Sequence, residues 1–136
     1  MAIVVGYVPT KEGRAALRRA AKECELRQSR LIVVSSNRGG KAYDVDEASR
    51  FETELNGVQE RLEAAGLEHE VRLLVRGNEP AEDLIQVADA VRAEFIVIGL
   101  RRRTPVGKLI LGSNAQRILL DASCPVLAVK AGPDEE

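Results

Sequence analysis

Aromatic side chains are scarce in this chain of 136 residues, which contains two Phe, two Tyr and no Trp. Proteins that bind single-stranded nucleic acid stack the bases on aromatic side chains set among basic ones. The 20 basic residues are also balanced by 21 acidic ones, so no general attraction for a polyanion is expected. The sequence therefore predicts that the protein has no nucleic-acid partner.

Cysteine and histidine are rare as well. The two cysteines, Cys24 and Cys124, are far apart and form no C-x-x-C pair, so neither a disulfide framework nor a zinc site is predicted. His69 is the single histidine and is expected to be exposed at the start of a strand, which leaves no Ser-His-Asp or multi-histidine arrangement. No pair of carboxylates is placed for acid–base chemistry, so we predict no catalytic residue, no metal site and no enzyme activity.

Long apolar runs are also missing. No stretch approaches the length of a membrane span, and Met1 leads directly into Ile3-Val4-Val5 without a basic segment. We therefore expect a cytoplasmic protein with no membrane partner. Hydrophobic residues make up 45% of the chain, which is enough for one core, so we expect one domain over residues 1–131 and a short acidic tail over 132–136.

Two sequence patterns alternate along the chain. Five short runs of consecutive apolar residues, rich in Val and Ile, are typical of strands that are buried on both faces. The stretches between them place apolar residues at helical spacing. This alternation predicts an α/β fold, with an open, doubly wound, Rossmann-like sheet of five parallel strands and helices on both faces. The predicted strands are residues 3–6, 31–35, 71–75, 95–98 and 126–129.

Capping residues predict where the four helices begin. Ser, Thr, Asp and Asn accept hydrogen bonds from the first free amides of a helix, and Pro is favoured at the first helical position. Asp83 and Asp89 fall on the third helix, where we expect them on the outer face. The predicted starts are marked by Thr10, by Asp44 with Glu47, by Asn78 with Pro80 and by Ser113 with Gln116.

The loop after the fourth predicted strand concentrates positive charge. In an open doubly wound sheet, ligands bind at the carboxyl ends of the strands, near the point where the strand order reverses. This loop carries Arg101, Arg102 and Arg103 and ends at a predicted helix start, at Gly112 and Ser113. Free amides, the helix dipole and guanidinium groups together favour an anion such as phosphate. The alternative is that Ser113 only caps the helix and the arginines are solvated.

Three segments of the chain resemble the universal stress protein family. They are residues 3–17, the Gly77-Asn-Glu-Pro-Ala-Glu82 segment, and residues 99–130 with their Gly-Ser-Asn-Ala-Gln-Arg-Ile-Leu-Leu run. The segments come in the family's order and together span nearly the whole chain. The resemblance implies a stress-response protein with the predicted fold.

The same resemblance implies a phosphate site. Family members that bind ATP carry Gly, two residues, Gly, nine residues, and then Gly with Ser or Thr. Gly99, Gly112 and Ser113 match this spacing, and Asn114 follows them. Arg102 stands at the second glycine, where its side chain either blocks the phosphate or replaces amide contacts with a charged fork.

The resemblance also bears on the base pocket. Nucleotide-binding members usually carry an Asp at the end of the first strand, facing the adenine, and this chain has Val8 there. We interpret Val8 as a continuation of the buried strand, although Val8 and Ile98 remain the candidates for the base pocket.

Two functions are therefore open at this point. One is a regulatory protein that binds ATP or AMP, with Mg²⁺ accompanying the nucleotide, or another anion, at the loop after the fourth strand. The other is a homodimeric stress-response interaction protein that has lost nucleotide binding. Pairing through the last strand, residues 125–130, is what the family resemblance implies, and an exposed edge strand favours it.

Overall fold

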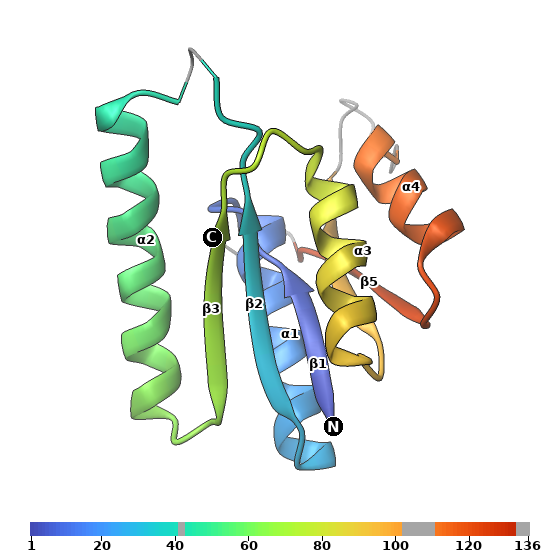
Figure 1. Cartoon of the computed structure of the whole chain (residues 1–136). Coiled ribbons are helices and arrows are strands. Elements are labelled where there is room, and N and C mark those ends of the chain that lie inside the picture. The colour runs from blue at the N-terminus through green and yellow to red at the C-terminus, as the bar shows by residue number, and fades with distance from the viewer. Residues whose placement is uncertain (41–42, 102–110, 133–136) are drawn as a thin grey trace.

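The computed structural model describes residues 1–40, 43–101 and 111–132. Within them, strands and helices alternate along the whole chain (Figure 1), which confirms the predicted α/β fold. The strands are β1 (Ala2–Gly6), β2 (Arg30–Ser36), β3 (His69–Leu74), β4 (Ile96–Leu100) and β5 (Val126–Lys130), and the helices are α1 (Lys11–Arg27), α2 (Val45–Ala64), α3 (Pro80–Val91) and α4 (Ser113–Asp121).

All five described strands are parallel and lie in the order β3-β2-β1-β4-β5. The chain first builds outward from β1 through β2 to β3, and then returns to the other side of β1 to place β4 and β5. The order therefore reverses between β1 and β4, which pair through Val4 with Ile96 and Val5 with Val97. Such a reversal opens a crevice at the carboxyl ends of the two central strands.

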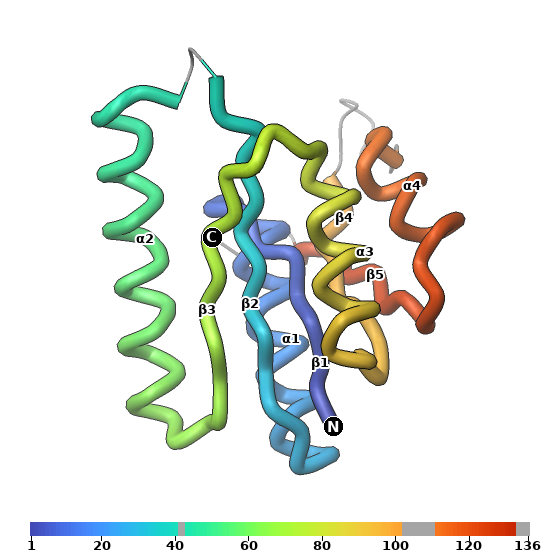
Figure 2. Tube along the Cα trace, viewed as in Figure 1, coloured from blue at the N-terminus to red at the C-terminus, as the bar shows by residue number. Residues whose placement is uncertain are grey.

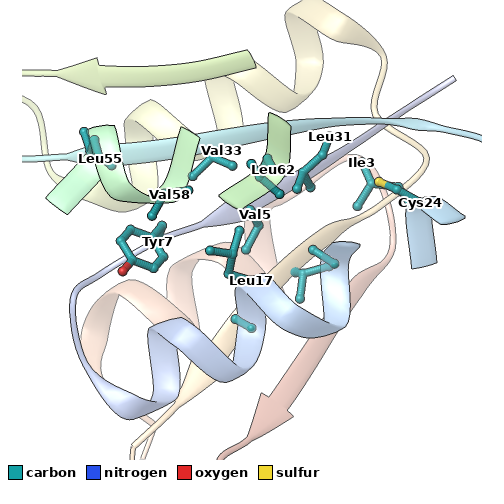
Figure 3. Packing of buried hydrophobic residues seen from close by; sticks show 13 residues of the cluster. Ile3, Val5, Tyr7, Leu17, Cys24, Leu31, Val33, Leu55, Val58 and Leu62 are labelled. Carbon is teal, nitrogen blue, oxygen red and sulfur yellow. The ribbon is translucent and has the colours of Figure 1, made fainter. Parts of the chain in front are cut away.

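Two apolar clusters fill the space between the sheet and its helices. The side chains of Ile3, Val5 and Tyr7, from β1 and the residue after it, point toward α1 and α2. Figure 3 shows them in one cluster with Leu17, Cys24 and Val58. Alternate residues of the central strands point to the other face, where they pack against α3 and α4. The traces in Figures 1 and 2 show α3 and α4 on the opposite face of the sheet from α1.

The edge strands are less buried than the sequence predicted. Every residue of β3, including His69, is partly exposed, and Ala128 and Lys130 of β5 are exposed. The central strands carry runs of side chains with almost no exposed area, because they have a neighbour on each side and helices over both faces. The prediction of burial on both faces is therefore correct for β1, β2 and the first part of β4, and wrong for β3 and β5.

Two of the predicted helix starts are confirmed by their caps. The Thr10 side chain accepts a hydrogen bond from the Gly13 amide at 3.1 Å, and the Asp44 side chain accepts one from the Glu47 amide at 2.9 Å. The Glu47 carboxylate pairs with Arg50.

The other two caps were predicted one residue off. Glu79 is the N-cap of α3 and Gly112 is the N-cap of α4, and neither makes a side-chain capping bond. The Asn78 side chain donates instead to Asp83, and Ser113 is already the first helical residue. Pro80 does occupy the first helical position, where its missing amide hydrogen costs nothing.

The two cysteines are free thiols. Cys24 is buried on the apolar face of α1 and Cys124 is partly exposed. Burial raises the pKa of Cys24 to about 12 and also raises that of Cys124, so both thiols stay protonated at neutral pH.

Candidate functional site

A cavity of about 360 Å³ lies at the carboxyl ends of β1 and β4, where the strand order reverses. The ends of β1, β2 and β4 form its floor, and the first turns of α1, α3 and α4 form its walls. The cavity therefore lies where ligands bind in doubly wound sheets. The lining residues are Gly6, Tyr7, Val8, Thr10, Glu12, Val34, Ser36, Pro80, Leu84, Ile98, Gly99, Leu100, Arg101, Gly112, Ser113, Asn114, Ala115 and Ile118.

The structure brings most of the predicted site residues to this one cavity. Those that line it come from the end of β1, the end of β4 and the start of α4. Arg102 and Arg103 lie outside the described residues, and binding of an anion by this set stays a prediction. The predicted residues that line the cavity are Val8, Ile98, Gly99, Arg101, Gly112, Ser113 and Asn114.

Val8 does not continue the buried strand, and that interpretation was wrong. Strand β1 ends at Gly6, and Val8 is 49% exposed at the mouth of the cavity. Its carbonyl oxygen accepts a hydrogen bond from the Thr10 amide at 2.8 Å, which closes a tight turn into α1. The turn carries Val8 out of the sheet and gives the cavity an apolar edge at this point.

Two glycines allow α1 to approach the sheet closely enough to wall the cavity. A Cβ atom at Gly99 would lie 2.4 Å from the backbone oxygen of Glu12, and one at Gly13 would lie 1.9 Å from the backbone oxygen of Val8. Real Cβ contacts are never so short, so the packing of β4 and the first turn of α1 requires glycine at both positions. Gly99 therefore has a packing role whether or not a phosphate binds beside it.

The helices α3 and α4 both begin at the cavity. The Asn114 side-chain oxygen accepts a hydrogen bond from the Ala81 amide at 3.1 Å, so a side chain of α4 satisfies a free amide at the start of α3. Gly112, the N-cap of α4, has no side chain that could cover the amides of that helix. The helices α3 and α4 thus both direct the positive ends of their dipoles to the cavity, where an anion would be stabilised.

A buried carboxylate supports the wall of the cavity. Asp83 has no exposed area and accepts hydrogen bonds from Ser36 at 2.5 Å, Arg76 at 2.7 Å and Asn78 at 3.0 Å. Burial on its own would raise the pKa of Asp83, but the three hydrogen bonds and the Arg76 charge outweigh it and lower the pKa. The bonds connect the ends of β2 and β3 to the first turns of α3.

This role of Asp83 was not predicted from the sequence, and the expectation that Asp83 lies on the outer face of α3 was wrong. One signal was available. Asp83 lies four residues before Val87 and next to Leu84, both of which belong to the buried face of the helix. A residue at that spacing lies on the same face.

Tyr7 lies under the cavity and directs its hydroxyl away from it. The hydroxyl donates a short hydrogen bond to Glu54 of α2. Burial, and then this hydrogen bond, raises the pKa of Tyr7 to about 12. The Tyr7 hydroxyl is therefore engaged by α2 and is not available to a ligand in the cavity.

Within residues 1–40, 43–101 and 111–132, no three side chains of His, Cys, Asp or Glu are grouped to hold a metal ion. None of the helices in these ranges combines the length and apolar character needed to cross a membrane.

Comparison with known proteins identifies the family. The model of the universal stress protein family matches residues 1–130, and this chain belongs to that family. A universal stress protein of Mycolicibacterium smegmatis is 43% identical over 128 residues, which cover 94% of this chain and 96% of that protein.

Two solved structures extend the likeness to three dimensions. A universal stress protein from Archaeoglobus fulgidus matches with a TM-score of 0.84 and 39% identity, over 96% of this chain and 98% of that one. A universal stress protein from the same organism in complex with dAMP matches with a TM-score of 0.79 and 34% identity, over 96% and 98%.

Proposed function

We propose that this protein is a stress-response regulator that binds an adenine nucleotide in the cavity between β1 and β4. The observation that carries the proposal is the convergence of Gly99, Arg101, Gly112 and Ser113 on one cavity at the reversal of strand order. The complex of a 34% identical relative with dAMP supports an adenine nucleotide as the ligand class.

The chemistry of the lining favours one orientation of the nucleotide in the cavity. Val8, Val34, Leu84 and Ile98 make one part of the lining apolar, which suits the faces of a purine ring. Arg101 and the amides at the start of α4 form the other part, which suits a phosphate. Arg102 and Arg103 follow Arg101 directly in sequence and add to the positive charge of this segment.

We propose binding without turnover. Any Mg²⁺ would enter with the phosphates of ATP, because the described residues hold no group of metal ligands. AMP is therefore expected to bind equally well with and without Mg²⁺.

Calorimetric titration with AMP, ATP and cyclic AMP, with and without Mg²⁺, tests the proposal. Ser113→Ala and Arg101→Ala should each weaken AMP binding by about three- to tenfold, because each removes one hydrogen-bond or charge contact to phosphate. Lys22→Ala removes an exposed charge elsewhere on α1 and should change nothing. Absence of binding at millimolar nucleotide, or equal affinities for all four proteins, would refute the proposal.

The variant Arg102→Gly distinguishes the two outcomes expected for the altered family pattern. If the Arg102 side chain blocks the phosphate, the variant binds more tightly than the natural sequence. If its guanidinium replaces amide contacts, the variant binds more weakly.

We propose in addition that two copies pair through β5. This strand lies at the edge of the sheet, with β4 on one side of it, and its exposed residues include Ala128. An uncovered edge strand presents a row of free amides and carbonyls to another chain. If nucleotide binding is absent, this pairing is the feature that supports the second function, a homodimeric interaction protein.

A further inference from the structure

The polar side chains that line the cavity are largely occupied by bonds to the protein itself. The Thr10 hydroxyl oxygen accepts from the Gly13 amide, the Ser36 hydroxyl donates to Asp83, and the Asn114 oxygen accepts from the Ala81 amide. The Tyr7 hydroxyl donates to Glu54. Few side-chain groups are left in the wall to read the hydrogen-bonding pattern of a ligand.

Besides Arg101 and Ser113, which are proposed to hold the phosphate, Glu12 is the exception. It lies in the first turn of α1, is partly buried, and lines the cavity. It is the one carboxylate among the described residues of the lining, and no hydrogen bond or ion pair joins it to the residues that the structure describes. A carboxylate beside the cavity with no partner of its own is available to a ligand.

The position of Glu12 indicates which part of a nucleotide it meets. Its backbone packs against Gly99 at the end of β4, and Gly99 is one of the residues proposed for the phosphate. The sugar of a nucleotide lies between the base and the phosphate. An ionised carboxylate repels phosphate and accepts hydrogen bonds, and the donors of an adenine nucleotide are the sugar hydroxyls and the amino group of the base. The contact of Glu12 with Gly99 favours the sugar hydroxyls, because the sugar is joined directly to the phosphate.

We infer that Glu12 accepts hydrogen bonds from the ribose hydroxyls and makes the cavity select ribonucleotides over deoxyribonucleotides. The inference rests on the proposed nucleotide function and adds to it a specificity-determining residue. Asp and Glu take this role toward ribose in other sheets of doubly wound topology, from a different place in the fold. Here the acid comes from the first turn of α1, and position 8 contributes only the Val8 side chain.

Titration with AMP, 2′-deoxy-AMP and 3′-deoxy-AMP tests the inference. At least one deoxy analogue should bind about tenfold more weakly than AMP, which is the effect of losing a hydrogen bond to a charged group. Glu12→Ala should weaken AMP to the level of that analogue and leave the analogue's own affinity within about twofold. Glu12→Gln keeps an acceptor oxygen without the charge and should retain part of the difference.

Glu25→Ala is the matched control, because Glu25 is an exposed acid on the same helix and lies outside the cavity lining. It should keep the full preference for AMP. Equal binding of AMP and both analogues to the natural protein, or a preference that persists in Glu12→Ala, would overturn the inference and leave the proposed function standing. No binding of any of the three would overturn both.

Discussion

At the scale of single residues, Asp83 is the group on which most local structure depends. It receives hydrogen bonds from Ser36, Arg76 and Asn78 and has no exposed area. Removal of a buried acceptor leaves its donors without partners, which costs more free energy than the net worth of the bonds.

We therefore expect Asp83→Ala to lower the free energy of unfolding by about 2–3 kcal/mol. Asp89→Ala is the control, because Asp89 is exposed on the same helix and should change stability by less than about 0.5 kcal/mol. Urea denaturation followed by circular dichroism measures both. Equal effects of the two substitutions would contradict the assigned role of Asp83.

The lowered pKa of Asp83 makes part of this stability dependent on pH. A carboxylate whose pKa is lower in the folded than in the unfolded protein stabilises the fold above the unfolded pKa, which is about 3.9 for Asp. That contribution is lost as the pH falls from about 5 through the folded pKa. The loss of stability between neutral and acid pH should therefore be smaller in Asp83→Asn than in the natural protein.

Some residues of the site could be predicted from the sequence and others could not. It selected Gly99, Arg101 and Ser113, because glycine spacing and charge are visible without a fold. It missed Asp83 and misjudged Val8, because their environments depend on which helix face is covered and where β1 leaves the sheet. No sequence pattern predicted Glu12 at the site, since only the packing of α1 against Gly99 places it at the cavity.

At the scale of elements, the decisive feature is how closely α1 approaches its neighbours. Gly13 of α1 and Gly57 of α2 are both helical, so intrinsic helix propensity favours Ala at both by about 1 kcal/mol. A Cβ at Gly13 would meet the Val8 backbone oxygen at 1.9 Å, whereas a Cβ at Gly57 would meet nothing nearer than the end of the Arg61 side chain at 4.0 Å.

The two substitutions should consequently change stability in opposite directions. Gly13→Ala forces the backbone to move and should destabilise the protein by about 1–3 kcal/mol. Gly57→Ala should stabilise it by about 0.5–1 kcal/mol. Thermal unfolding of both variants measures the pair, and a stable Gly13→Ala protein would show that α1 can shift away from the sheet at little cost.

The helix boundaries show what sequence can and cannot fix at this scale. Thr10 and Asp44 cap their helices with their own side chains, so local sequence was sufficient. The first turn of α3 receives its side-chain partner from Asn114, which is 33 residues away from Ala81 in the sequence. Local capping rules contain no information about a bond between two helices.

At the scale of the whole molecule, the edge strand β5 is where we propose that two copies pair. The Pro125 carbonyl oxygen accepts from the Ile96 amide of β4 at 3.0 Å, so the backbone groups of residues 125, 127 and 129 face β4. Backbone groups alternate in direction along a strand, which turns the amide of Ala128 away from β4 and toward the free edge.

Ala128→Pro should therefore abolish the proposed dimer without disturbing the pairing of β4 with β5, since proline removes only the outward amide hydrogen. Ala128→Ser retains that hydrogen and should remain dimeric. Light scattering after size-exclusion chromatography at several concentrations gives the masses, and circular dichroism checks the fold. A monomeric natural protein, or a dimeric Ala128→Pro variant, would exclude pairing through β5.

The global fold was the part most accessible from sequence. Continuous apolar runs that alternate with stretches of helical spacing admit few arrangements other than a parallel sheet between helices. The five described strands form such a sheet, in the order β3-β2-β1-β4-β5. The extent of burial at β3 and β5 was not accessible, because the sequence pattern does not reveal which strands lie at the edges.

The close contact between Gly99 and the Glu12 backbone also affects how this family's sequences are to be interpreted. A chain that abandoned its ligand would still need Gly99, because the fold itself has no room for a side chain there. We therefore expect glycine at this position in binders and non-binders alike. The presence of Gly99 therefore indicates the fold and not the ligand. Loss of the ligand has to be recognised at positions that packing does not constrain in this way, among them Glu12 and Ser113.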